Sequence, residues 1–149
     1  MCATKYFLLL CVAAVVYTAS ISDCTARTKK HQSAVTNFFK NISQSNLIFD
    51  CLCAERAEGL AWFAAIGATT QDYSRYYNVY SISETDGNQK ENERVKSLLE
   101  KLVQEKPEIK EEKRKNGYYG CAYSTGVKNG NTNHVLTCVF SKTSARCYD

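Results

Sequence analysis

The sequence predicts an α+β domain in which about three helices pack on a small antiparallel sheet that ends in a C-terminal hairpin. Apolar residues recur at helical spacing in three separate segments, which predicts amphipathic helices. Aromatic and β-branched residues gather in residues 74–83 and on both sides of Asn129-Gly130, which predicts strands and a tight turn. A set of cysteines predicts that disulfides stabilise this frame.

Residues 1–22 have the form of a secretory signal peptide. Lys5 precedes an apolar run of about a dozen residues, and small residues follow from Thr18 to Ser22. A membrane-spanning helix needs about 20 apolar residues, so this run is too short to be an anchor. We therefore expect cleavage between Thr18 and Ser22, a secreted, extracellular protein without a membrane span, and one mature domain over residues 23–149.

The charge of the mature chain is mildly basic. Removing the signal peptide takes away Lys5 from the 19 basic residues and none of the 15 acidic ones, so the formal net charge falls from +4 to +3. The basic residues in 90–116 alternate with Glu, which is typical of a solvated helix surface. We expect no nucleic-acid partner, because no basic stripe is present.

Cysteine usage indicates an oxidising compartment. Two of the eight cysteines lie in the predicted signal peptide, and the even number that remains is typical of a disulfide framework whose pairing the sequence leaves open. Cys51 and Cys53 should face nearly opposite sides of a helix and therefore have different partners. We expect neither a metal nor a cofactor. The predicted disulfide cysteines are Cys24, Cys51, Cys53, Cys121, Cys138 and Cys147.

The first helix is predicted over residues 27–44, where apolar residues gather on one face. At the edge of this face, Asn41-Ile42-Ser43 is a glycosylation sequon, so Asn41 is a candidate glycosylation site. The apolar positions are Ala34, Val35, Phe38, Phe39 and Ile42.

The second helix is predicted over residues 50–67. Asp50 is a suitable N-cap and Gly67 a suitable C-terminal stop. The segment is apolar around most of its circumference, which predicts a central position. Small side chains share one side and allow another element to approach closely; they are Ala54, Ala57, Ala61, Ala64 and Ala65.

A strand is predicted over residues 74–83, and a third helix over residues 90–106, which Pro107 ends. The charged stretch 108–116 is expected to fray. If Asn129-Gly130 forms a two-residue turn, Cys121 lies directly opposite Cys138 in the hairpin. These cysteines then either bridge each other or point toward the second helix, and a wider loop over 126–133 would change the register.

Candidate functional residues are few. Only His31 and His134 could supply an imidazole, and His31 falls on the apolar face of the first helix, where a histidine is usually a core or boundary residue. The layout resembles that of pancreatic-type ribonucleases, but the lysine and threonine signature of that family is missing. We expect no catalytic residue. A tyrosine cluster is a candidate binding surface, although the same residues could line the sheet; its members are Tyr73, Tyr76, Tyr77 and Tyr80.

The order of these segments resembles the CAP (SCP/TAPS) superfamily, especially the activation-associated secreted proteins of parasitic nematodes. "KHQSAV" at 30–35 resembles the first-helix histidine segment, and "DCLCAERAEGLAWFA" at 50–64 resembles the Asp-Cys opening of the next helix. "YNVY" at 77–80, "YYGCAYS" at 118–124 and "VLTCVFS" at 135–141 are similar to its strands. The resemblance covers most of the mature chain and implies an α-β-α sandwich.

One motif of the family is absent. Its helix with His, Tyr, Thr and Gln is replaced by "EIKEEKRKN" at 108–116, so the cavity residues that bind metal in some members have no counterparts. The resemblance implies a shortened, nonenzymatic secreted protein of a parasitic nematode that binds a host protein or modulates immunity. It also leaves open a carrier of a small apolar ligand such as a lipid or sterol, and, less in keeping with the sequence, a small ribonuclease-type hydrolase.

Overall fold

The computed structural model describes residues 24–42, 46–68, 77–85, 87–112, 117–143 and 147. The predicted signal peptide, Tyr73 and Tyr76 lie outside the described residues. The helices and strands, in chain order, are α2 (Ala26–Ile42), β1 (Leu47–Phe49), α3 (Cys51–Ala65), β2 (Asn78–Thr85), α4 (Glu91–Glu105), α5 (Ile109–Glu112), β3 (Gly117–Lys128) and β4 (Asn131–Ser141).

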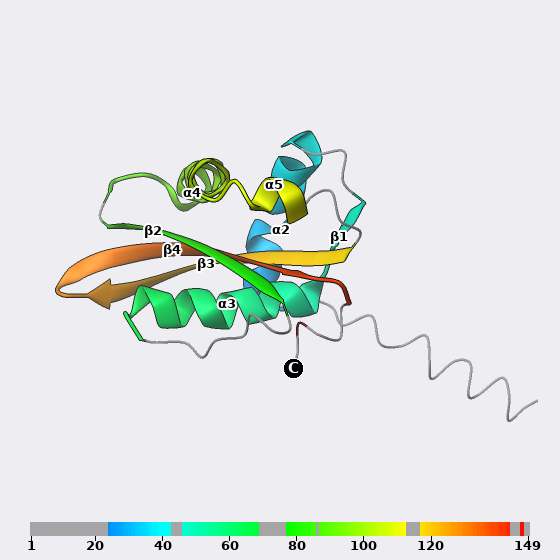
Figure 1. Ribbon diagram of the computed structural model, residues 1–149. Coiled ribbons are helices and arrows are strands. Elements are labelled where there is room, and N and C mark those ends of the chain that lie inside the picture. The colour runs from blue at the N-terminus through cyan, green and yellow to red at the C-terminus, as the bar shows by residue number, and fades with distance from the viewer. Residues whose placement is uncertain are drawn as a thin grey trace, which may run out of the picture.

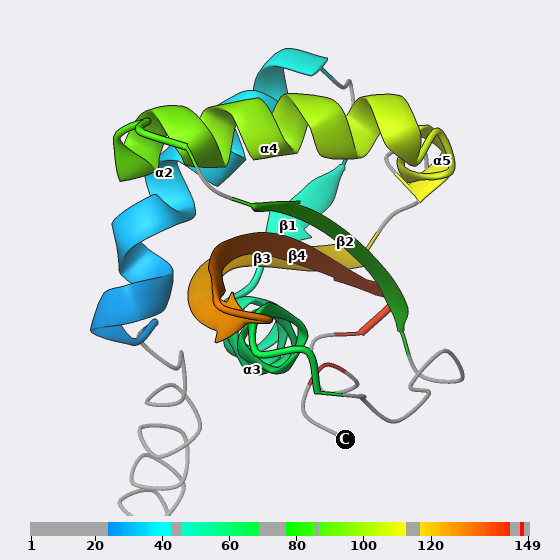
Figure 2. The same ribbon diagram turned by 90° about the vertical axis from the view of Figure 1, so that its left-hand side faces the viewer.

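These elements form three layers. The sheet lies in the middle, α3 covers one of its faces, α4 and α5 cover the other, and α2 runs past the sheet from the level of α3 up to α4 (Figure 1). Seen along the sheet, α4 runs over the curved strands and α3 runs beneath them (Figure 2). The predicted α+β class is confirmed, with helices on both faces of a small sheet.

The sheet is mixed, whereas a purely antiparallel sheet was predicted. Its order is β1-β3-β4-β2, and β1 runs parallel to β3, with Leu47 beside Gly117 and Phe49 beside Tyr119. The sequence prediction missed β1, because three residues are too short to show a period of two. β2 is described from Asn78 to Thr85, slightly later than the predicted segment.

The predicted hairpin register is confirmed. Lys128 pairs with Asn131, and Cys121 pairs with Cys138. Asn129 and Gly130 both have positive φ, at 53° and 82°, as a two-residue turn of this kind requires. Cys121 and Cys138 bridge each other in the core instead of reaching toward α3.

The other two disulfides both start at the first turn of α3. Cys51 bonds Cys24, just before α2, and Cys53 bonds Cys147 near the C-terminus. Cys51 and Cys53 therefore have different partners, as their spacing predicted. Both bonds join segments that are distant in sequence to the beginning of one helix.

The main core lies between the sheet and the helices α2, α4 and α5. The buried side of α4 matches the predicted stripe, and the ring of Phe39 on α2 lies 4.9 Å from that of Tyr119. Burial of this apolar surface supplies the main driving force for folding. Fully or nearly fully buried members are Val35, Phe39, Val95, Leu98, Leu99, Leu102, Leu136 and Phe140.

On the opposite face, α3 lies unusually close to β3. A Cβ placed on Gly120 would lie 2.1 Å from the backbone nitrogen of Ala54, and one on Gly126 would lie 2.8 Å from the carbonyl carbon of Ala65. The predicted row of small residues therefore meets glycines of the strand, which permits backbone contact. Ala54, Ala57, Ala61 and Ala65 have no exposed surface.

Two expectations about the helices were wrong. α3 is not buried all round, because it covers its face of the sheet alone and its outer side meets solvent; Trp62 and Phe63 are 46% and 43% exposed. Residues 109–112 do not fray but form α5. Ile109 is buried there, and Glu112 accepts a hydrogen bond from Asn78 Nδ2 at 2.5 Å, which ties α5 to β2.

We predict that Gly120→Ala lowers the free energy of unfolding by about 3 kcal/mol, because the new methyl group would overlap the backbone of α3. Gly59→Ala is the matched control. Gly59 lies within α3, and a Cβ there meets nothing within 4 Å, so the same change should stabilise the protein by about 0.5–1 kcal/mol. Urea unfolding measures both; equal effects of the two substitutions would contradict the close approach.

Candidate functional site

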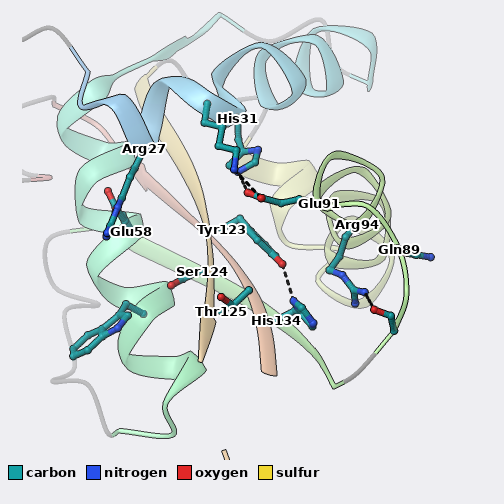
Figure 3. A pocket seen from close by; sticks show the side chains of 13 residues that line it. Arg27, His31, Glu58, Gln89, Glu91, Arg94, Tyr123, Ser124, Thr125 and His134 are labelled. Atoms are coloured by element: carbon teal, nitrogen blue, oxygen red, sulfur yellow. Dashed lines mark hydrogen bonds and ion pairs between the residues drawn. The ribbon is translucent and has the colours of Figure 1, made fainter. Parts of the chain in front are cut away.

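A polar cleft of 540 Å³ opens where three helices and the two strands of the hairpin converge (Figure 3). α2 contributes Arg27, Lys30 and His31, and α3 contributes Glu58 and Trp62. The remaining lining residues come from the segment around the start of α4 and from the hairpin; they are Gly87, Gln89, Glu91, Arg94, Tyr123, Ser124, Thr125 and His134. The size is typical of small-molecule sites, which occupy about 300–1,000 Å³.

His31 forms one wall of this cleft. It is 5% exposed, and its Nε2 lies 2.8 Å from Glu91 Oε1. A carboxylate only accepts hydrogen bonds, so Nε2 carries the proton and donates it. Nδ1 is buried without a hydrogen-bond partner among the described residues. His31 therefore presents neither ring nitrogen freely to the cleft.

Glu91 links two residues of α2 to the start of α4. Its other oxygen, Oε2, lies 2.7 Å from Lys30 Nζ. The hydrogen bond from Lys30 is the largest effect that lowers the pKa of the Glu91 carboxyl below its ordinary value of 4.5, and the bond from His31 adds to it. Glu91 is thus a charged acceptor at neutral pH.

Tyr123 lies between the two histidines. Its hydroxyl is 2.7 Å from His134 Nδ1 on the neighbouring strand, and its ring meets that of His31 edge-on with centroids 5.7 Å apart. Burial is the main effect that raises the pKa of the Tyr123 hydroxyl above its ordinary value of 10.0, so the phenol keeps its proton and can donate it to His134. Tyr123 and His134 also stack with an interplanar angle of 12°.

Arg94 is a buried cation at the α4 side of the cleft. Its side chain is 2% exposed; Nη1 lies 3.6 Å from Glu84 Oε2, and Nη2 donates to the carbonyl oxygen of Gly87. A buried guanidinium needs such partners, because an unpaired buried charge is costly. Arg94 thus fixes the loop before α4 on β2.

The opposite side of the cleft has an ion pair and an exposed indole. Arg27 Nη1 lies 3.3 Å from Glu58 Oε1, although Arg27 is 86% exposed and the pair contributes little to stability. One helical turn beyond Glu58, Trp62 contacts Phe63 edge-on with ring centroids 5.0 Å apart. The rim therefore combines an aromatic surface with charged hydrogen-bonding groups.

The arrangement is suited to hydrogen bonding more than to proton transfer. Each of the cations Arg27, Lys30 and Arg94 has a carboxylate partner. Both histidines make a ring-nitrogen hydrogen bond within the protein. Within the described ranges, no group of three or more His, Cys, Asp or Glu residues could hold a metal ion.

The structure brings together some predicted candidates and separates others. His31 and His134 share the cleft, and His31 has the boundary position that its helical face predicted. Tyr77, proposed as part of a binding surface, is instead 3% exposed and accepts a hydrogen bond from Arg56 Nε. Tyr80 is half-buried against Phe140, so these two tyrosines line the sheet because the helices cover them.

Burial also raises the pKa of Tyr80 to about 12, with the Glu112 carboxylate adding to the effect, so this phenol is no acid–base group at neutral pH. Asn41 of the sequon is exposed near the end of α2, where a glycan would meet solvent. The sequence prediction missed Glu91, Arg94 and Trp62 as neighbours of the histidines. Of these three residues, only Trp62 could have been suspected as a site residue from the sequence, because it follows Glu58 by one turn on an Ala-rich helix.

Compared with known protein families, characterised proteins and solved structures, the chain shows no match. Across the described segments, every helix is too short or too polar to cross a membrane.

We predict that Glu91→Gln lowers the free energy of unfolding by about 0.5–1 kcal/mol at neutral pH. The side chain of Glu91 is 40% exposed, so solvent screening keeps the value small. Because the folded pKa is lowered, the contribution of Glu91 is full above pH 4.5 and disappears as the pH falls through the folded value.

Urea unfolding of the parent and of Glu91→Gln between acid and neutral pH measures this difference in the free energy of unfolding. Glu100→Gln is the control, since it removes an exposed carboxylate from the same helix. A constant difference between Glu91→Gln and the parent at every pH would contradict the bonds from Lys30 and His31.

Proposed function

We propose that this chain is a secreted, nonenzymatic binding domain that acts between a parasitic nematode and its host, and that it binds a host protein through the polar cleft. The observation that carries the proposal is the cleft itself. It is 540 Å³ in volume, and each of its cations already pairs with a carboxylate of the protein. Such a wall presents fixed donors and acceptors to a ligand.

The condition of the histidines supports binding over catalysis. A general base must reach the proton that it removes, directly or through one water. His31 has Nε2 bonded to Glu91 and Nδ1 buried, and His134 has Nδ1 bonded to Tyr123. These contacts hold the two rings in place. They do not leave one accessible imidazole nitrogen on each histidine, as a pair of one base and one acid would need.

The host setting in this proposal is taken from the resemblance of the sequence motifs to the CAP superfamily. The elements follow the order α2, β1, α3, β2, α4, α5, β3 and β4, which contains the two helices, strand, helix and terminal hairpin that the resemblance implies. The "YYGCAYS" and "VLTCVFS" segments lie on β3 and β4, where the resemblance implies strands. Secretion and a host setting follow from that resemblance together with the predicted signal peptide.

The lipid-carrier alternative gains no support from the cleft. An acyl chain or sterol needs a largely apolar lining. None of the 13 lining residues has an aliphatic side chain, and Trp62 follows Glu58, the partner of Arg27, by one turn of α3. A polar ligand surface fits these groups better.

We expect Thr125→Arg to weaken capture of a host partner at least about tenfold, because the long side chain would fill the cleft opening. The folded chain without residues 1–22 is immobilised and exposed to host serum and matrix extract. Captured proteins are identified by mass spectrometry, and the affinity of a recurrent partner is then measured.

Thr132→Arg is the matched control, since Thr132 is also an exposed threonine of the hairpin but does not line the cleft. It should bind like the parent. Equal binding by both variants would move the partner surface away from the cleft and contradict the proposal.

A ribonuclease-type hydrolase is the second candidate, because His31 and His134 converge on one cleft. In that reaction one imidazole takes the proton of the ribose 2′-hydroxyl, the 2′-oxygen bonds to phosphorus, and the bond from phosphorus to the 5′-oxygen breaks. The other imidazole protonates the 5′-oxygen, and a cyclic phosphate remains.

Incubation with single-stranded RNA tests this candidate, and we expect no cleavage above that of a blank preparation. Cleavage that is lost in both His31→Ala and His134→Ala, while circular dichroism shows both variants folded, would establish the enzyme and overturn the nonenzymatic proposal.

A further inference from the structure

We infer that the ligand of the cleft is a neutral saccharide, such as the end of a host glycan, which stacks on Trp62 and hydrogen-bonds to the polar wall beside it. This inference rests on the proposed function, because it names the part of the partner that the cleft recognises. Three features carry it: the balance of charge, the exposed indole, and the mixture of donors and acceptors.

Every cation of the wall already has a carboxylate partner. Arg27 and Lys30 pair with the lining residues Glu58 and Glu91, and Arg94 pairs with Glu84 of β2, which is not among the lining residues. An anionic ligand would have to displace a carboxylate from its cation. A cationic ligand would have to displace a cation from its carboxylate. An uncharged polyhydroxylated ligand meets neither cost, since its hydroxyl groups donate to carboxylates and accept from cations at the same time.

Trp62 supplies the apolar surface that a sugar ring needs. The C–H groups of a pyranose form a flat apolar patch, which packs well on the face of an indole. Trp62 is 46% exposed although it is a large aromatic residue, and Phe63 holds it edge-on at 5.0 Å. The indole is therefore positioned and accessible before any ligand arrives.

Polar groups surround the place where the ring edges would lie. Glu58 lies one helical turn before Trp62 and its side chain is 23% exposed. Across the cleft, Ser124 and Thr125 bring hydroxyl groups from β3 (Figure 3). A carboxylate and neighbouring hydroxyls can engage adjacent hydroxyl groups of a sugar, and the carboxylate bonds are the stronger ones.

A nucleotide fits the same surface less well. Its base could stack on Trp62, but its phosphate would meet Glu58 and Glu91 together with the cations that they already neutralise. Repulsion between the phosphate and these two carboxylates disfavours binding. The observations thus favour the neutral ligand, and charged ligands become outcomes of the test.

Trp62 is the one tryptophan of the whole chain, so its fluorescence reports on the cleft without a label. The folded chain is titrated with lactose, N-acetyllactosamine, mannotriose and chitotriose. Sialyllactose, sulfated lactose and adenosine monophosphate are the charged probes. We expect at least one neutral sugar to shift the Trp62 emission to shorter wavelength in a saturable manner, and the charged forms of the same sugar to bind no tighter.

Glu58→Gln should weaken binding of that sugar about tenfold, because it removes a charged acceptor. Glu100→Gln removes a carboxylate on the exposed side of α4 and should leave the affinity unchanged. Tighter binding of the sulfated or phosphorylated probes, equal affinities of the two variants, or no shift with any neutral sugar would each overturn the inference.

Treating the captured host partner with glycosidases separates this inference from the proposed function. Loss of binding after removal of the glycan supports the inference. Binding that survives the treatment but is lost in Thr125→Arg would keep the binding function and overturn the sugar as its target.

Discussion

The close approach of α3 to β3 is the constraint on which the rest of the structure depends. Gly120 and Gly126 have no space for a side chain, so the helix lies against the strand backbone along its length. This contact fixes the height and direction of α3. It also places Glu58 and Trp62 in the wall of the cleft, where Glu58 pairs with Arg27 of α2. A larger residue at either glycine would move one whole wall.

The cleft lies where the apolar layers end. Beneath it, α2 and α4 pack on the sheet through side chains with almost no exposed surface. At the start of α2 and of α4 the pattern changes to charged residues, and these pair with each other across the gap: Lys30 and His31 with Glu91. Backbone elements are thus held by the core, whereas the shape of the opening is held by hydrogen bonds.

Local patterns in the sequence predicted the local structure well. The helical stripes, the caps of α3 and the hairpin register depend on neighbouring residues, and Asn129-Gly130 alone sets the alignment of Cys121 with Cys138. β1 and α5 were missed or misjudged because their stability comes from distant contacts: β1 pairs with Gly117–Tyr119, and Glu112 of α5 bonds Asn78.

The candidate site was harder to predict than the fold for the same reason. The two histidines could be chosen by type, but Glu91 and Trp62 join them in one cleft only when α2, α3, α4, β3 and β4 are assembled. The disulfide partners of Cys51 and Cys53 could be separated by helical geometry, yet not identified. Tyr77 and Tyr80 were ambiguous because a residue in or beside a strand faces either solvent or a helix. The packing of α3 on Tyr77 and of α5 near Tyr80 decides which.

The two long-range disulfides have a topological consequence for cleavage of the backbone. Cys24–Cys51 and Cys53–Cys147 form adjoining covalent loops that together enclose nearly all of residues 24–149. A single cut between Cys24 and Cys51, or between Cys53 and Cys147, leaves its two fragments joined by a bridge. Only a cut within Cys51-Leu52-Cys53 would release them, and that stretch is the first turn of α3, where Asp50 accepts a hydrogen bond from the Cys53 amide. In a medium rich in proteases, a nicked molecule would therefore remain one covalent body.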